Sequence, residues 1–445
     1  VPRIWDEDQL LPRMWDAGGH AVGVMAPGGW IAQVSPDGQD WQLLASGFRN
    51  EYDIALNPDG ELFTYDADME YDFNTSWYRP TRLNHVVSGS EFGWRNGAGK
   101  RPGFYSDNLP AVIDIGPGSP TGTTFGYGAK FPARYQNALF SLDWSWGKLH
   151  AVHLEPDGST YKAVREEFLS GAPLPLTDAV IHPGDGAMYF AIGGRRVQSG
   201  LYRVTYTGTE STALVAAKPT TSPARDLRHQ LEALHGKADP QALAVAWPHL
   251  GHADRFIRWA ARTAIEHVPS AQWADRALTE KNPSARMEAL LGLARVGGIS
   301  PPHRTKESPP VNTELGKKIL GALVAADWQA LDGERRAMLV RTAEITLHRF
   351  DLLPGKDTAA LLAKLDPLFP ASTPELNWLL CETLVYLRSP TVAAKTMALI
   401  AAAPTQEEQI EYARSLRMLA TGWTTATRNA YFEWFLKAAN FRGGA

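Results

Sequence analysis

Turn signals of the form Pro-Asp-Gly divide the first half of the chain into short segments, and they constrain the fold more than any other feature. They occur at Ser35–Gly38, Asn57–Gly60 and Glu155–Gly158, each beside runs of β-branched or aromatic residues. Proline fixes φ, aspartate bonds nearby backbone and glycine supplies a positive φ, so each triplet favours a reversal of the chain. Residues 1–208 are therefore predicted to be all-β.

A longer pattern also repeats within this half. The segment from Pro36 to Phe63 contains Pro-Asp-Gly, then Asp-Ile-Ala, then a Leu-Phe strand, and it is echoed between Pro156 and Tyr189. A weaker third copy is Asn137–Asp143. A four-stranded blade needs roughly 40 to 50 residues, so the copies predict a partial all-β propeller of about four blades. An incomplete ring of this kind would leave sheet faces and edges exposed.

The second half has the pattern of helices. Residues 209–224 are small and polar with two prolines, and they are predicted to link a propeller domain at 1–208 to a helical domain at 225–445. Two stretches, Leu250–Ile265 and Asn282–Arg295, carry apolar residues at helical spacing. Paired helical patterns continue through most of the remaining chain, which predicts an all-α, HEAT-like helical solenoid.

Composition narrows the possible function classes. The 445 residues are 44% hydrophobic with a formal net charge of −4, as expected for a globular chain of two domains. No apolar run is long enough to span a membrane, and the balanced charge offers no basic face to nucleic acid. The lone cysteine, Cys381, is predicted to be a buried thiol, and one cysteine excludes covalent c-type haem in this chain. Because the chain opens on Val1 without a signal segment, we expect a fragment or a processed product of something longer.

Carboxylates alternate along Tyr65–Asp72 (YDADMEYD). In an extended strand alternate side chains face the same way, so these acids would repel one another unless a positive charge lay nearby. One hypothesis is a solvated loop neutralised by Arg79 and Arg82. The other is a bound Ca²⁺, which prefers six to eight oxygen ligands. The candidate metal ligands are Asp66, Asp68 and Glu70.

The order of three motifs resembles a known family. Gly47–Asn50 (GFRN), Asn57–Phe63 (NPDGELF) and Asn84–Trp94 (NHVVSGSEFGW) are similar to the soluble quinoprotein glucose/sorbosone dehydrogenase propellers. The closer resemblance is to planctomycete-type membrane-bound dehydrogenase or haem-binding proteins, which join such a propeller to HEAT-like helices and usually to a cytochrome c module. Segments such as Trp77–Arg82 (WYRPTR) and Pro173–Asp178 (PLPLTD) extend the likeness over nearly the whole chain.

This resemblance implies a periplasmic or otherwise extracytoplasmic redox enzyme. It would transfer hydride from a small sugar or alcohol to pyrroloquinoline quinone (PQQ), with Ca²⁺ polarising the quinone and a cytochrome c domain or protein accepting the electrons. Carried over by position, Arg49 and Asn50 would face the central channel and contact cofactor and substrate. Arg195 and Arg196 would pair with the cofactor carboxylates. The family uses a histidine as general base, and His20 is the candidate here.

Two departures from the family leave a second function class open. Ala67–Met69 replaces the family's Gly-Pro calcium turn, and no histidine stands at the position of the family's base. Arg49 could instead satisfy backbone groups between blades, and Asp143 could hydrogen-bond a turn rather than act in catalysis. The alternative is a non-catalytic propeller and HEAT scaffold that binds carbohydrate or protein, since stacked helical repeats offer long binding surfaces.

Overall fold

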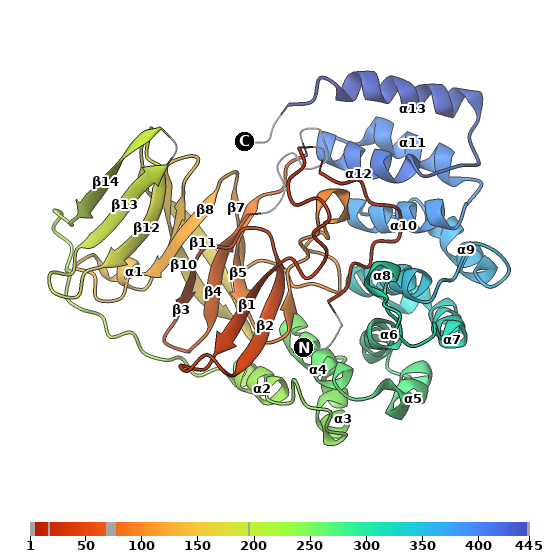
Figure 1. The fold of residues 1–445 in the computed structure, drawn as a ribbon, viewed down its shortest axis with the longest axis horizontal. Helices are drawn as coiled ribbons and strands as arrows, with labels where there is room; N and C mark the ends of the chain where they lie inside the picture. The colour runs from red at the N-terminus through yellow and green to blue at the C-terminus, as the bar shows by residue number, and fades with distance from the viewer. Residues whose placement is uncertain (1–4, 17, 68–76, 195, 443–445) are drawn as a thin grey trace.

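A computed structural model describes residues 5–16, 18–67, 77–194 and 196–442. Four β-sheets come first and a stack of helices follows (Figure 1), which confirms the predicted change from strands to helices. In strand order, the sheets are β1 (Gly29–Val34), β2 (Trp41–Phe48) and β6 (Ser90–Glu91); β3 (Ile54–Leu56), β4 (Leu62–Asp66), β5 (Thr81–Val86) and β7 (Ile113–Gly116); β11 (Thr160–Ser170), β10 (Lys148–Asp157), β9 (Leu139–Asp143) and β8 (Pro120–Phe125); and β12 (Leu176–Ile181), β13 (Met188–Gly194) and β14 (Val197–Val204).

The sequence repeat marks equivalent strands of these sheets. β4 (LFTYD), β9 (LFSLD) and β13 (MYFAIGG) each pair with the short strand that precedes them, as an antiparallel hairpin. The described residues form four sheets, the same number as the predicted blades. The first and last sheets expose large apolar side chains, among them Trp30, Leu201 and Tyr202, as expected for sheets whose outer faces lack a neighbour.

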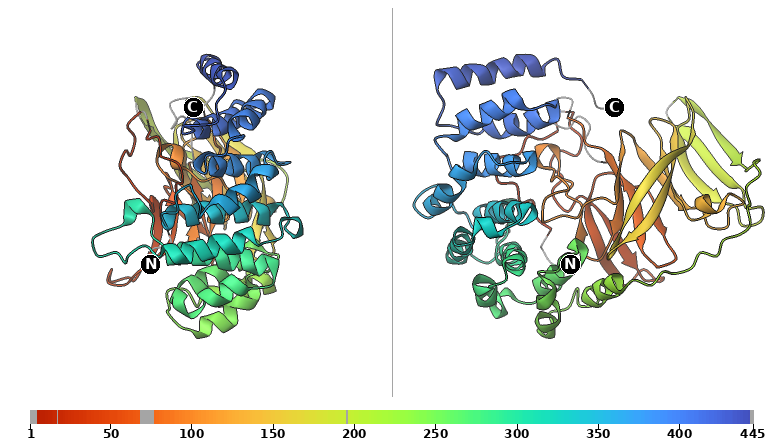
Figure 2. Two further views of the ribbon diagram at one scale, coloured as in Figure 1. Left: turned by 90° about the vertical axis from the view of Figure 1, so that its right-hand side faces the viewer. Right: turned by 180° about the vertical axis from the view of Figure 1, so that it is seen from behind.

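The helices form two rows. One row, made of α4, α6, α8, α10 and α12, packs side by side facing the sheets, and the other row lies behind it; Figure 2 shows this stack from two sides. After the short α1 (Ala133–Gln136), the helices are α2 (Pro223–Glu232), α3 (Gln241–Ala246), α4 (Arg255–Glu266), α5 (Ala274–Thr279), α6 (Pro283–Gly297), α7 (Thr313–Val324), α8 (Gly333–Arg349), α9 (Ala359–Leu365), α10 (Pro374–Tyr386), α11 (Val392–Ala402), α12 (Gln406–Leu416) and α13 (Thr425–Ala438).

Capping side chains set where these helices begin. The Asp254 carboxylate accepts from two backbone N–H groups at the start of α4, and the Asn282 side chain does the same for α6. The Ser222 hydroxyl caps α2, so the helices begin at Pro223, and the last strand ends at Val204. Between them the chain crosses the sheet region, where the Thr220 hydroxyl donates to Asp59 at 2.9 Å.

Buried ion pairs join the sheets to the inner row of helices. The carboxylate of Asp8 lies against Arg349 of α8, with Nε–Oδ1 and Nη2–Oδ2 distances of 2.6 and 2.7 Å. Asp107, in the loop between β6 and β7, pairs with Arg341 through two contacts of 2.9 Å. All four side chains are almost completely buried. The N-terminal segment and this loop therefore occupy the face of the helix stack that the sheets cover.

The lone cysteine behaves as predicted. Cys381 is buried in α10, its Sγ lies 3.4 Å from Thr396 Oγ1, and burial raises the pKa of the thiol to about 12. Within the described ranges, no helix combines the length and the apolar character needed to cross a membrane.

The Asp8–Arg349 pair yields a stability prediction with a matched control. Asp8→Asn removes the carboxylate nearest to the buried Arg349 and also the 3.1 Å partner of Arg101, while Asp6 stays 3.8 Å from Arg349. We expect the free energy of unfolding to fall by about 3–5 kcal/mol. Asp351→Asn breaks a pair of similar geometry between Arg304 and a half-exposed aspartate, at 2.6 and 3.0 Å, and should cost about 0–1 kcal/mol. Both aspartates have a positive φ that asparagine tolerates. Urea unfolding of the two variants measures the difference, and equal losses would contradict a structural role for the Asp8 pair.

Candidate functional site

The predicted site residues that the structure describes lie in loops at the ends of strands, apart from Asp66, which ends β4. Arg49 and Asn50 precede β3, which begins beside the end of β4, because Ile54 pairs with Thr64. His20 lies in the loop before β1, and this strand begins opposite the end of β2. Arg196 lies in the turn between β13 and β14.

Contacts between neighbouring sheets show that these strand ends lie at the same end of the sheet region. The Asp53 carboxylate, just before β3, accepts from the backbone N–H of Thr123 in β8 at 2.9 Å. The Thr121 hydroxyl of β8 donates to the carbonyl of Leu176, at the start of β12, also at 2.9 Å. The beginnings of β3, β8 and β12 therefore lie next to one another, and the loops that carry the candidate residues share one end of the sheet region.

Asp66 makes several of the contacts at this end of the sheets. Its carboxylate is buried at the end of β4 and accepts hydrogen bonds from the backbone N–H of Asn50 at 2.8 Å and of Arg49 at 3.2 Å. The Nη2 atom of Arg82, its cross-strand neighbour, lies 3.7 Å from Oδ2. Asp66 thus ties the Arg49–Asn50 corner to β5 and has a positive charge beside it.

A glycine lets the chain make this corner. Gly47, at the end of β2, has φ of +80°, and a Cβ there would collide with the carboxylate of Glu91 and with the backbone of Gly93. Only glycine fits this position without displacing the buried Glu91. The Gly-x-Arg-Asn motif therefore has a structural explanation at its first residue.

Glu51 is a site residue that the sequence did not reveal. Its half-buried carboxyl lies near Asp66, and burial together with the negative charge of Asp66 raises the pKa of Glu51 to about 7. A carboxyl that titrates near neutral pH can exchange a proton with a substrate under ordinary conditions. The only sequence hint was its place directly after the Arg-Asn pair, since the charge that perturbs it stands fifteen positions later in the chain.

A cleft of about 370 Å³ opens beside Arg82. Prolines and aliphatic side chains form most of its wall, and Arg79, Arg82 and Asp114 supply its charges. Arg79 also pairs with Glu411 of α12 at 3.0 Å, so the cleft lies where the sheets meet the helices. Two guanidinium groups in a wall of mixed polar and apolar surface favour a ligand that carries carboxylates.

Of the three candidate metal ligands, Asp66 is among the described residues. Asp68 and Glu70 lie outside the described residues. Asp66 directs its carboxylate to Arg49, Asn50 and Arg82, which makes it a backbone cap in the described part of the chain. Within that part, no group of three acidic, histidine or cysteine side chains is arranged to hold a metal ion.

The other predicted residues have differing surroundings. Arg195 lies outside the described residues, and Arg196 is exposed with φ of +61°. The carbonyl oxygen of His20 accepts from Asn96 Nδ2 at 2.6 Å, while the residue as a whole is exposed. A role of these residues in catalysis or in cofactor binding stays a prediction.

Asp143 has the turn contacts that its sequence position suggested. At the end of β9, its carboxylate accepts from the backbone N–H groups of Ser119, Ser145 and Trp146 at 2.7, 3.0 and 3.2 Å. Asp66 and Asp143, equivalent in the sequence repeat, thus both cap backbone at the same edge of the sheets.

Comparisons with known proteins add a limited likeness. No family model and no curated protein matches the chain. Among solved structures, an oxidoreductase (glucose dehydrogenase) from Thermus thermophilus is 21% identical over 36% of this chain and 46% of that chain, with a TM-score of 0.29. The PQQ-bound form of aldose sugar dehydrogenase from Streptomyces coelicolor is 16% identical over 40% of this chain and 51% of that chain, also with a TM-score of 0.29.

The chain therefore spans about half the length of each of these two structures.

The pKa of Glu51 yields a pH prediction. Because the pKa of its carboxyl is about 7 in the folded chain and 4.5 ordinarily, its contribution to stability is complete below about pH 4.5 and is lost as the pH rises through 7. Glu51→Gln cannot ionise, so the urea midpoint of the wild type relative to this variant should decrease between pH 5 and pH 8. Glu155→Gln, at an exposed position of β10, is the control. A difference between wild type and Glu51→Gln that is independent of pH would contradict the assignment.

Proposed function

We propose that this chain is a quinoprotein-like dehydrogenase domain that oxidises a small sugar or alcohol. The observation that carries the proposal is Glu51, a carboxyl with a pKa of about 7, which adjoins the Asp66–Arg82 pair and the Arg49–Asn50 corner. Oxidation of an alcohol needs a group that accepts the hydroxyl proton while hydride leaves the carbon. Glu51 is a better candidate for that base than the exposed His20.

The described residues fit an anionic cofactor better than a calcium ion. The adjacent cleft offers the guanidinium groups of Arg79 and Arg82 to the carboxylates of PQQ, and Arg49 and Asn50 precede the neighbouring strand β3. PQQ would supply the hydride acceptor when bound. We assign no step to Ca²⁺, because Asp66 is engaged with Arg49, Asn50 and Arg82.

In this proposal the chain's own residues position the alcohol and move one proton. The carboxylate form of Glu51 takes the proton from the substrate hydroxyl, and burial together with the negative charge of Asp66 keeps the pKa of Glu51 high enough for that transfer. The Arg82 guanidinium, held by the Phe92 carbonyl at 2.8 Å, keeps a fixed cation at the cleft. The electrons would pass to a cytochrome c module or partner in the periplasm.

Dye-linked oxidation tests this function. The full chain, supplied with PQQ and Ca²⁺, should oxidise at least one member of a sugar and alcohol panel, and Glu51→Gln should lower kcat by about 100-fold or more. Glu155→Gln should retain activity. No turnover, together with no cofactor absorbance retained after desalting, would overturn the proposal.

A non-catalytic scaffold is the second candidate, and the strand-end acids favour it. Asp66 and Asp143 make the same kind of backbone cap, so the acidic feature that suggested a redox site has a structural use. The inner row of helices is covered by the chain's own sheets and loops. A scaffold would therefore bind carbohydrate or protein on other surfaces, and wild-type turnover in the dye-linked assay would exclude this interpretation.

A further inference from the structure

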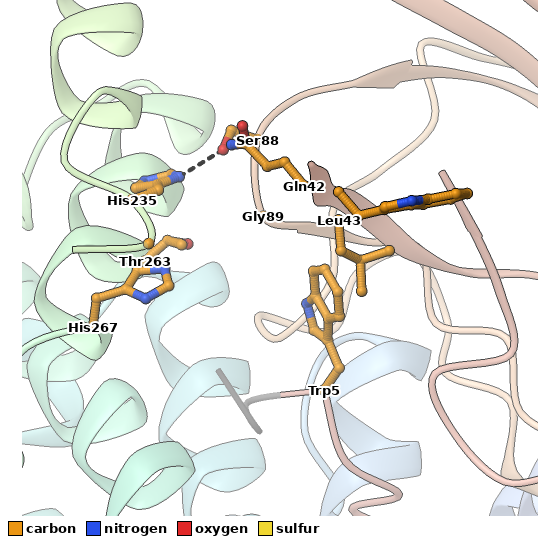
Figure 3. Close-up of a pocket in the computed structure, with 10 residues that line it drawn as sticks. Trp5, Gln42, Leu43, Ser88, Gly89, His235, Thr263 and His267 are labelled. Atoms are coloured by element: carbon orange, nitrogen blue, oxygen red, sulfur yellow. Dashed lines mark hydrogen bonds between the residues drawn. The ribbon is translucent and has the colours of Figure 1, made fainter. Parts of the chain in front are cut away.

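A separate cavity lies between the first sheet and the helices, away from Arg49 and Asp66. Its volume is about 140 Å³, close to that of cavities that admit a six-membered ring in other proteins. Figure 3 shows Trp5 facing His267 and Thr263 across it, with Ser88 and His235 at the top. The wall also includes Trp41, Gln42 and Leu43 of β2.

One donor in this wall has no partner. Trp5 is 8% exposed, its indole Nε1 is buried, and within the described part of the chain no acceptor lies within hydrogen-bond distance. A buried donor without an acceptor costs about 1–3 kcal/mol. An oxygen of a molecule in the cavity would satisfy it, so the indole points to a ligand that carries acceptors.

The histidines show that the ligand should be neutral. His235 Nε2 donates to the carbonyl of Ala260 at 2.9 Å, and Nδ1 lies 2.9 Å from the Ser88 hydroxyl, which donates to it when the ring is neutral. Burial lowers the pKa of both His235 and His267 to about 4. The wall contains no lysine, arginine, aspartate or glutamate among the described residues, so at neutral pH it offers dipoles and no net charge to a ligand.

Trp41 adds an aromatic surface to the polar groups that line the cavity. Trp41 is 63% exposed, and its ring meets Trp30 edge-on, with centroids 6.4 Å apart and planes at 70°. An exposed indole offers a flat apolar surface beside the polar interior. Molecules with an apolar ring face and hydroxyl groups on their edge match both parts.

We propose that this cavity is a binding site for a neutral, hydroxyl-rich ring, such as one monosaccharide unit. Hydroxyl oxygens would accept from the Trp5 indole N–H and exchange a hydrogen bond with His267, and the ring face would pack on Trp41. The ligand would contact β2 and the Ser88–Gly89 turn on one side and α4 and the end of α2 on the other. The site needs neither PQQ nor turnover, so it is independent of the function proposed above.

Calorimetric titration of the full chain with D-glucose, without PQQ or Ca²⁺, tests this site. Trp5→Phe keeps an aromatic ring but removes the N–H donor, and we expect it to weaken binding about 5- to 10-fold. Trp41→Ala should weaken binding by a similar or larger factor. Trp30→Ala is the matched control, because Trp30 is exposed next to Trp41 but does not line the cavity, and it should bind as the wild type does.

Absence of saturable heat with glucose, or equal affinities in Trp41→Ala and Trp30→Ala, would overturn the proposal. Trp41 is exposed, so its replacement keeps the test valid even if Trp5→Phe disturbs the packed N-terminal segment. Glucose that binds at the Glu51 edge would be insensitive to Trp41→Ala and sensitive to Glu51→Gln. Failure of this inference and failure of the proposed dehydrogenase activity therefore give different results.

Discussion

The pairing of buried carboxylates with buried arginines is the interaction on which the rest of the structure depends. A charge transferred alone into a protein interior costs several kcal/mol, and the carboxylates of Asp107 and Asp8 offset that cost for Arg341 and Arg349 of α8. Those acids come from the sheet half of the chain, more than 230 positions away. The two halves must therefore fold against one another, and the helix stack has its inner face filled from within the same chain.

A second group of ion pairs joins the sheets to α2, at the N-terminal end of the helix stack. Glu61, in the turn before β4, contacts Arg228 of α2 at 2.6 Å and His85 at 2.7 Å. Burial acts to raise the pKa of Glu61, but the His85 hydrogen bond and the Arg228 charge lower it to about 2. The carboxylate therefore stays ionised at neutral pH. The cavity lined by Trp5 and the cleft lined by Arg79 both lie at boundaries between sheets and helices, the first beside α4 and the second beside α12.

The sequence predicted the strands and helices better than the contacts between residues that are far apart in the chain. The Leu-Phe repeats identified β4 and β9 correctly, and the spacing of apolar residues predicted helices within Leu250–Ile265 and Asn282–Arg295, because these signals act over a few residues. It offered Arg79 and Arg82 as positive partners for the alternating acids, and in the structure Arg82 Nη2 lies 3.7 Å from the buried carboxylate of Asp66. It did not anticipate Glu51, because the pKa of that carboxyl depends on burial and on Asp66 at the end of a different strand, which local sequence does not encode.

Local chemistry alone determined the strand and helix halves, the turns, the caps and the buried cysteine, since each follows from the conformational preferences of neighbouring residues. Only the tertiary structure decided which arginines became buried, which carboxyl titrates near neutral pH and where the cavities lie. The physical reason is that desolvation and Coulomb energy depend on distances between groups far apart in the chain. Trp5 illustrates this division: its sequence position gives no sign of function, yet packing against the helices leaves its indole N–H without a partner among the described residues, at the wall of a cavity.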